Sequence, residues 1–259
     1  MDAIERIEVA VRTQLSYHHA HNHGPFAYAE DPRSLPKLCS PPGRPPDKNN
    51  ERILREFIER VEDETLRSHD EFKNHFFAKH GDEHKYLPIW MTTEVMTFRT
   101  VLTMLENCSV KVKQSVADLF AMPHNIFVSW MLTINTVRNI AAHHSRLWNR
   151  KIGSGPTIPT GKNYREWNTP VLIKHERVFA AFSVISYCVR KVTGNNHWAQ
   201  RFAELLQKHP NIPVRYMGFP EKWAESPIWE GAVLPSPAVS VGAVSAPAVV
   251  PVPVAPPAP

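Results

Sequence analysis

The chain has 259 residues, of which 42% are hydrophobic and 21% are charged, and its formal net charge is +5. This composition is ordinary for a globular protein, so it excludes collagen-like and wholly disordered chains. The length is enough for one or two domains that bury a core without disulfides or metals. The modest positive charge permits an anionic partner without requiring one.

Three cysteines, Cys39, Cys108 and Cys188, lie far apart and form no CxxC pair. We expect free thiols in a reducing compartment, with Cys108 and Cys188 facing the core. The N-terminal sequence has no apolar run typical of a secretory signal. The longest uncharged run, 231–259, is too rich in proline to form a membrane-spanning helix. The sequence therefore predicts a soluble, cytoplasmic protein with no membrane partner.

Apolar residues recur at helical spacing along most of the chain. In chain order, the predicted helices cover 3–16, 49–79, 86–107, 112–121, 123–150, 171–193 and 196–208. Prolines and turn residues predict a loop over 24–48, a second over 152–163 and irregular chain over 210–230. No run of strands, internal repeat or GxGxxG motif is present. We expect one all-α domain over 1–232 and a disordered Pro/Ala/Val-rich tail over 233–259.

The most informative segment runs from Trp130 to Lys151 and reads as part of one helix. At about 100° per residue, its apolar side chains form one continuous stripe that ends at Trp148 and includes His144. This pattern predicts that His144 and Trp148 pack in the core. His143 and Asn139 fall on roughly the opposite face, with Arg146 and Arg150 beside them. Arg138 lies about 100° from Asn139 around the helix.

Positive charge is concentrated around the same segment. Between Asn107 and Ile152 there are six Lys or Arg residues and one acidic residue, Asp118. A phosphate-binding surface needs such a concentration. Arginine can donate two hydrogen bonds to a phosphate at once, and histidine can exchange a proton near neutral pH.

The string RNIAAH, Arg138 to His143, resembles the R-x4-6-H motif of HEPN-type nucleases. The wider string RNIAAHHSRLWNR is similar to the signature of the Abi-like, or abortive infection, family of bacterial proteins. Three further stretches agree with that family: AIERIEVAVRT at 3–13, YLPIWMTTEVMTF at 86–98 and MGFPEKWAESPIW at 217–229. The resemblance implies a HEPN-like helical bundle and a role in phage defence.

The resemblance also implies a chemistry. HEPN nucleases cut RNA without a metal or other cofactor, because the 2′-hydroxyl attacks the adjacent phosphate. On this chain, His143 would move the proton, Arg138 would stabilise charge on the phosphate, and Asn139 would orient one of them. The expected RNA-binding residues are Arg146, Arg150 and Lys151, with His144 and Trp148 as structural neighbours.

HEPN sites are usually formed where two helices that carry the motif meet. This chain has one such motif, so the resemblance implies a homodimer if the protein is active. An inhibitory RNA or a protein antitoxin is a further partner that this kind of protein would have. Two alternatives stay open. The fold could serve as an RNA-binding or interaction module without turnover. Family members usually carry helical sequence ahead of the AIERIEVAVRT stretch, so the chain could also be a shortened, inactive member.

A cluster of histidines over 18–23 raises the possibility of a metal site. No cysteine and no carboxylate pair at a fixed spacing accompanies these histidines. We therefore expect no metal site there.

Overall fold

The computed structural model describes residues 1–39, 47–153 and 155–232. In these ranges the chain forms helices and short 3-10 turns, with no strand beyond an isolated bridge between Lys151 and Arg177. The predicted all-α fold is confirmed. The tail predicted over 233–259 lies outside the described residues.

Ten α-helices are present in the described ranges: α1 (Asp2–His23), α2 (Ala27–Glu30), α3 (Lys48–Arg67), α4 (Glu71–His80), α5 (Ile89–Val95), α6 (Phe98–Asn107), α7 (Val110–Asp118), α8 (His124–Ala142), α9 (Val178–Thr193) and α10 (His197–Lys208). The 3-10 turns are η1 (Pro32–Ser34), η2 (Pro36–Leu38), η3 (Lys162–Trp167), η4 (Val214–Met217), η5 (Trp223–Glu225) and η6 (Pro227–Trp229).

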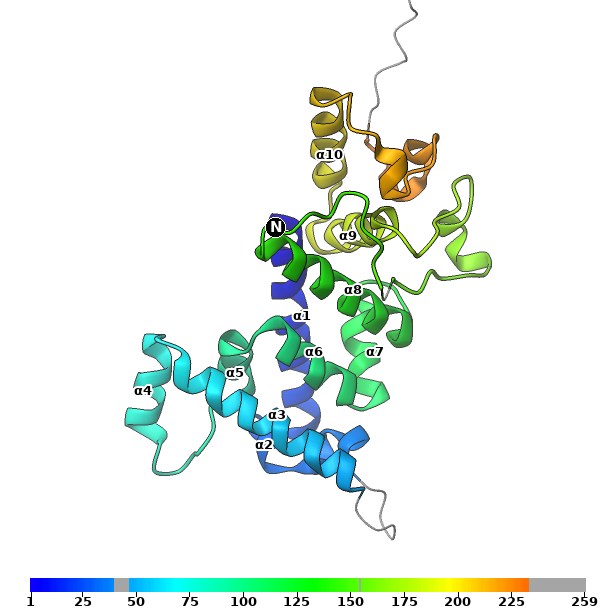
Figure 1. Ribbon diagram of the computed structural model, residues 1–259. Coiled ribbons are helices and arrows are strands. Elements are labelled where there is room, and N and C mark those ends of the chain that lie inside the picture. The colour runs from blue at the N-terminus through cyan, green and yellow to red at the C-terminus, as the bar shows by residue number, and fades with distance from the viewer. Residues whose placement is uncertain (40–46, 154, 233–259) are drawn as a thin grey trace, which may run out of the picture.

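The long helix α1 is the axis of the fold (Figure 1). α6, α7 and α9 each pack against both α1 and α8, so these two helices share three neighbours. α3 crosses the lower part of the molecule against α5 and α6, and α10 lies with the C-terminal turns at the other end. One hydrophobic core extends through these elements, and it fixes the position of α8.

The apolar stripe of α1 behaves as predicted, because Ile4, Ile7, Val11 and Leu15 are all buried. The helix nevertheless continues seven residues past the predicted end at 16. It ends at Gly24, which has a φ of 95° and donates its backbone N–H to the Ala20 carbonyl. The histidines of 18–23 are therefore helical, although they lie beyond the predicted helix.

Two of the predicted helices are each divided in two. The helix predicted over 49–79 is broken at Ser68, whose hydroxyl accepts a hydrogen bond from the backbone N–H of Asp70. The helix predicted over 86–107 is broken at Met96, and Thr97 caps α6 by accepting from the N–H of Thr100. Short hydroxyl side chains compete with the helical backbone for these hydrogen bonds and so favour helix ends. α9 also begins at 178 rather than 171, because the preceding chain is extended or turned.

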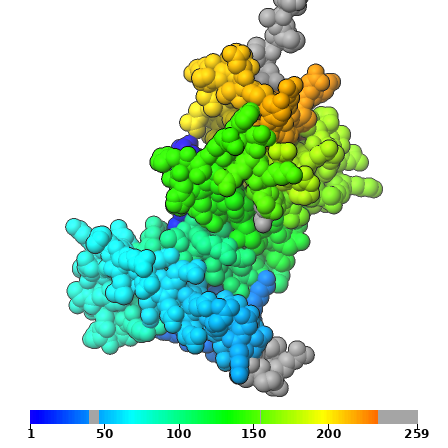
Figure 2. Space-filling model, viewed as in Figure 1, coloured from blue at the N-terminus to red at the C-terminus, as the bar shows by residue number. Residues whose placement is uncertain are grey.

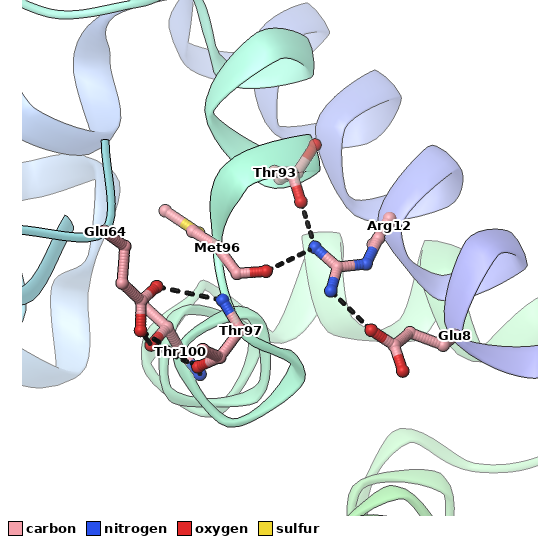
Figure 3. Close-up of polar contacts among 7 residues, drawn as sticks. All are labelled: Glu8, Arg12, Glu64, Thr93, Met96, Thr97 and Thr100. Atoms are coloured by element: carbon pink, nitrogen blue, oxygen red, sulfur yellow. Dashed lines mark hydrogen bonds and ion pairs between the residues drawn. The ribbon is translucent and has the colours of Figure 1, made fainter. Parts of the chain in front are cut away.

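Two polar contacts join these broken helices to their neighbours (Figure 3). Arg12 of α1 donates hydrogen bonds to the carbonyl oxygens of Thr93 and Met96 at the end of α5. Glu64 of α3 accepts hydrogen bonds from the backbone N–H and the hydroxyl of Thr97 at the start of α6. Each contact satisfies backbone groups that a helix end leaves unpaired.

The chain over 210–230 is irregular, as predicted, but it contributes buried aromatic residues. Trp223 and Trp229 are 3% and 0% exposed, and their rings pack edge to face at 4.9 Å. The indole N–H of Trp229 donates to the hydroxyl of Ser183 on α9 at 2.9 Å. This C-terminal segment therefore closes the core over α9, and Figure 2 shows it packed beside α10.

Candidate functional site

The candidate site is positioned by α8, which is anchored along its buried side. Trp130, Ile134 and Val137 are almost fully buried, as the sequence predicts. The indole N–H of Trp130 donates to the Thr157 carbonyl at 2.8 Å, and its ring packs on that of Trp167 at 4.8 Å. These contacts hold α8 in one rotation about its axis.

α8 ends at Ala142, so the helix predicted over 123–150 is too long by eight residues. The N–H of His144 donates to the Ala141 carbonyl at 3.0 Å, and that of Ser145 donates to the Ile140 carbonyl at 2.9 Å. His144 has a positive φ of 51°. Together these features make a Schellman motif, which ends a helix with one left-handed residue. Histidine is among the few residues other than glycine that are enriched in this conformation.

The end of the helix overturns two predictions. His144 is exposed and not packed in the core, because the left-handed turn takes its side chain off the helical stripe. Arg146 and Arg150 are exposed, but they no longer share a helix face with Asn139 and His143. Helical periodicity cannot be extended beyond the residue at which the backbone leaves the helix.

The structural role expected for Trp148 is compatible with its position. The side chain is half-buried and packs against the core, with its ring edge-to-face on that of Tyr216 at 5.9 Å.

Asn139 and His143 are exposed and lie one turn apart, since the backbone N–H of His143 donates to the Asn139 carbonyl at 3.0 Å. Arg138 is half-buried on the adjoining face of the helix. Within the described residues, the three side chains make no hydrogen bond or ion pair. Their polar groups are therefore available to a ligand.

The chain after α8 folds back as a basic segment. The backbone N–H of Arg150 donates to the Leu147 carbonyl at 3.1 Å, and Lys151 forms the bridge with Arg177. Arg177 also donates a hydrogen bond of 3.4 Å from its guanidinium to the side-chain oxygen of Asn149. Arg177 is not among the residues predicted from the sequence, and no spacing pattern indicates it, because it is 28 residues from Asn149.

The six cations counted from the sequence do not form one surface. Lys113 is only 2% exposed and donates to the Glu106 carbonyl at 3.4 Å. Burial, together with the neighbouring Lys37, lowers the pKa of Lys113 to about 8. Burial and the same two lysines lower the pKa of His124, the first residue of α8. His124 is about 27 Å along the helix from Ala142, at about 1.5 Å per residue, so this group is separate from the site at the other end.

A family model described as "Abi-like protein" matches residues 1–149, which is more than half of the chain. The chain belongs to the Abi-like family. The match extends from α1 to just beyond α8 and so includes Arg138, Asn139 and His143. The resemblance over 217–229 lies outside it and stays a prediction. Comparison of this Abi-like protein with curated proteins and with solved structures found no match.

Two further properties of this Abi-like protein concern its described residues. Each helix there is too short or too polar to cross a membrane. No group of three or more His, Cys, Asp or Glu side chains in those ranges is placed to hold a metal ion. The histidines near the end of α1 instead divide between core and surface, with His19 fully buried and His21 exposed.

Proposed function

We propose that this Abi-like protein acts in abortive infection as a metal-independent endoribonuclease, with its site at the C-terminal end of α8. The observation that carries the proposal is the exposed helix end, where Asn139 and His143 lie beside Arg138 with their polar groups unengaged by other described residues. The segment that follows supplies exposed cations and no carboxylate, as RNA binding needs.

The chemistry follows from the properties of these groups. His143 takes the proton of a ribose 2′-hydroxyl, and the 2′-oxygen attacks the adjacent phosphorus. The bond from phosphorus to the 5′-oxygen breaks, which leaves a 2′,3′-cyclic phosphate, and the 5′-oxygen takes up a proton to give a hydroxyl. Arg138 stabilises the charge that develops on the phosphate, a contribution of about 3 kcal/mol for one well-placed donor. Asn139 orients His143 or the phosphate.

One chain supplies one histidine of this kind, whereas the reaction needs a base for the 2′-hydroxyl and an acid for the leaving oxygen. A homodimer that brings two α8 ends together supplies both. Arg146, Arg150 and Lys151 are all exposed and would bind the RNA backbone on either side. An inhibitory RNA or a protein antitoxin would act by covering the same surface.

The test compares wild type with His143→Ala and with His144→Asn. His144 is a matched control, because it is the adjacent exposed histidine and asparagine also tolerates its left-handed backbone. Each protein is incubated with end-labelled RNA in EDTA, and the product ends are analysed for cyclic phosphate. We expect wild type and His144→Asn to cleave, and His143→Ala to lose about 100-fold or more in rate.

Equal cleavage by His143→Ala would contradict the assignment. A wild-type protein that is folded and binds RNA but does not cut it would favour the non-catalytic RNA-binding module. In that case Arg146→Glu and Arg150→Glu are expected to weaken binding, while His143→Ala leaves it nearly unchanged.

A further inference from the structure

Two segments far apart in sequence meet beside the end of α8. One is 143–151, which follows α8, and the other is 208–216, which begins at the last residue of α10. The Trp148–Tyr216 ring contact joins them. Together they contain five Lys or Arg residues and three histidines, and neither contains an acidic residue. The fold therefore adds Lys208, His209 and Arg215 to the basic segment that follows α8, and the sequence motif alone does not predict this addition.

An open hollow of 460 Å³ lies between these segments. Its lining consists of Trp148, Lys208, His209, Pro210, Asn211, Ile212 and Pro213. The indole nitrogen of Trp148 is buried and has no hydrogen-bond partner among the described residues. Trp148 therefore offers no indole N–H to the hollow, and its apolar ring favours stacking over hydrogen bonding.

The charges at this hollow define what it can hold. Lys208 and His209 belong to the lining, and no carboxylate does. The Arg215 guanidinium lies 5.0 Å from the centre of the Tyr216 ring, and that ring contacts Trp148. An aromatic surface with cations around it matches a nucleotide, whose base stacks on the ring while its phosphate meets the positive charge.

We propose that this hollow is a subsite for one unpaired nucleobase of a single-stranded RNA, with Trp148 as the stacking surface. The inference deepens the proposed function and depends on its RNA substrate. Trp148 is five residues from His143, a distance of at most about 18 Å along the chain, so one short strand can reach both. In a duplex both faces of a base are covered by the neighbouring bases and cannot stack on Trp148. We therefore expect the subsite to bind single-stranded RNA in preference to duplex RNA.

The experiment measures the affinity of the full chain for two fluorescently labelled 12-nucleotide probes. One is 2′-O-methyl oligouridylate, which cannot be cleaved by 2′-hydroxyl attack, and the other is an abasic strand with the same number of phosphates. Trp148→Leu is compared with Trp90→Leu, a matched control in which an exposed tryptophan of α5 is replaced. Fluorescence anisotropy at one low salt concentration gives each Kd.

We expect wild type and Trp90→Leu to bind the base-containing probe about tenfold more tightly than the abasic probe, the usual effect of one stacked base. Trp148→Leu should lose that preference while its affinity for the abasic probe stays the same. An undiminished preference in Trp148→Leu, or no preference in wild type, would overturn the subsite.

A second measurement covers the case in which Trp148→Leu does not fold. Oligouridylate that contains 4-thiouridine is crosslinked to wild type, and the adduct is located by mass spectrometry. An adduct at residue 148 or within 208–216 supports the subsite, and adducts confined to other residues contradict it. If the protein prefers the base-containing probe but does not cleave RNA, the subsite stands and the proposed nuclease activity is wrong. If the protein cleaves RNA but Trp148→Leu does not change the preference for bases, the nuclease activity stands and the subsite is wrong.

Discussion

Arg12 of α1 donates a hydrogen bond of 2.8 Å to the backbone carbonyl of Met96, 84 residues away. The same guanidinium binds the Thr93 carbonyl and pairs with Glu8 one turn earlier on α1 (Figure 3). Carbonyl groups at the end of a helix have no partner within it and carry partial negative charge. Arg12 therefore completes the end of α5 and joins it to the central helix.

Replacing Arg12 tests how much this junction contributes. Arg12→Met keeps an apolar stem but leaves the two carbonyls and Glu8 without their cation. We expect the free energy of unfolding to fall by about 2–3 kcal/mol, because hydrogen bonds to charged groups contribute more than neutral ones. Urea denaturation followed by circular dichroism measures the change. Arg6→Met is the control, since Arg6 forms an exposed ion pair with Asp2, and we expect a loss of at most about 1 kcal/mol.

The Arg12 junction shows what sequence can and cannot supply. The Glu8–Arg12 ion pair has the i,i+4 spacing that brings two side chains together on a helix, so a sequence can indicate it. Residue spacing cannot predict the hydrogen bonds from Arg12 to α5, because they depend on how α1 and α5 pack against each other. In the same way, apolar periodicity predicted the helical regions but not the breaks at Ser68 and Met96, which are set by local hydroxyl caps and by contacts from other helices.

Glu64 forms the second junction between helices. Its carboxylate accepts hydrogen bonds from the N–H and hydroxyl of Thr97 and from the hydroxyl of Thr100 at 2.8 Å. Glu64→Ala should lower the free energy of unfolding by about 2 kcal/mol, and Glu64→Gln by less, since the amide oxygen can still accept. Glu59→Ala on the same helix is the control, because Glu59 is exposed. Equal losses in Glu64→Ala and Glu59→Ala would contradict a capping role.

His19 predicts a specific dependence of stability on pH. It is fully buried, and burial, with a smaller effect of His23, lowers its pKa from 6.5 to about 4. Below pH 6.5 the unfolded chain takes up a proton that the folded chain does not, so stability falls as the pH is lowered towards 4. The loss amounts to about 3 kcal/mol, at about 1.4 kcal/mol for each unit of pKa shift.

His19→Leu should remove this part of the acid dependence and leave stability at pH 7.5 unchanged or higher. The reason is that an apolar group replaces a buried ring that has no hydrogen-bond partner among the described residues. Carboxylates titrate in both proteins, so the comparison is between the slopes of stability against pH from 4 to 6.5. His21→Leu, at an exposed position of the same helix, should keep the wild-type slope. A steep slope in His19→Leu would assign the acid dependence to other groups.

The candidate site was found from sequence in part. The wider string from Arg138 to Arg150 resembles the Abi-like family, which the match over 1–149 confirms. The HEPN motif from Arg138 to His143 and the catalytic roles of its residues stay a prediction. The surface around the motif could not be predicted, because it depends on the turn after Ala142 and on the segment that contains Tyr216. A histidine pair in a helical pattern does not reveal which of its members will adopt a positive φ.

The effect of His144→Gly on the free energy of unfolding tests whether α8 ends at Ala142. His144 has a φ of 51°, so His144→Gly should raise the free energy of unfolding by about 0.5–1 kcal/mol, because glycine has no Cβ to strain there. His143→Gly is the matched control. Its φ is −89°, and glycine there gives no relief and should be neutral or destabilising. Had the helix continued to 150, both glycines would be in its interior and each would be destabilising by up to about 0.5 kcal/mol, since glycine has the lower helix propensity. A gain in stability at His144 with no gain at His143 is therefore the result that indicates the Schellman turn, which exposes His143 at the end of α8.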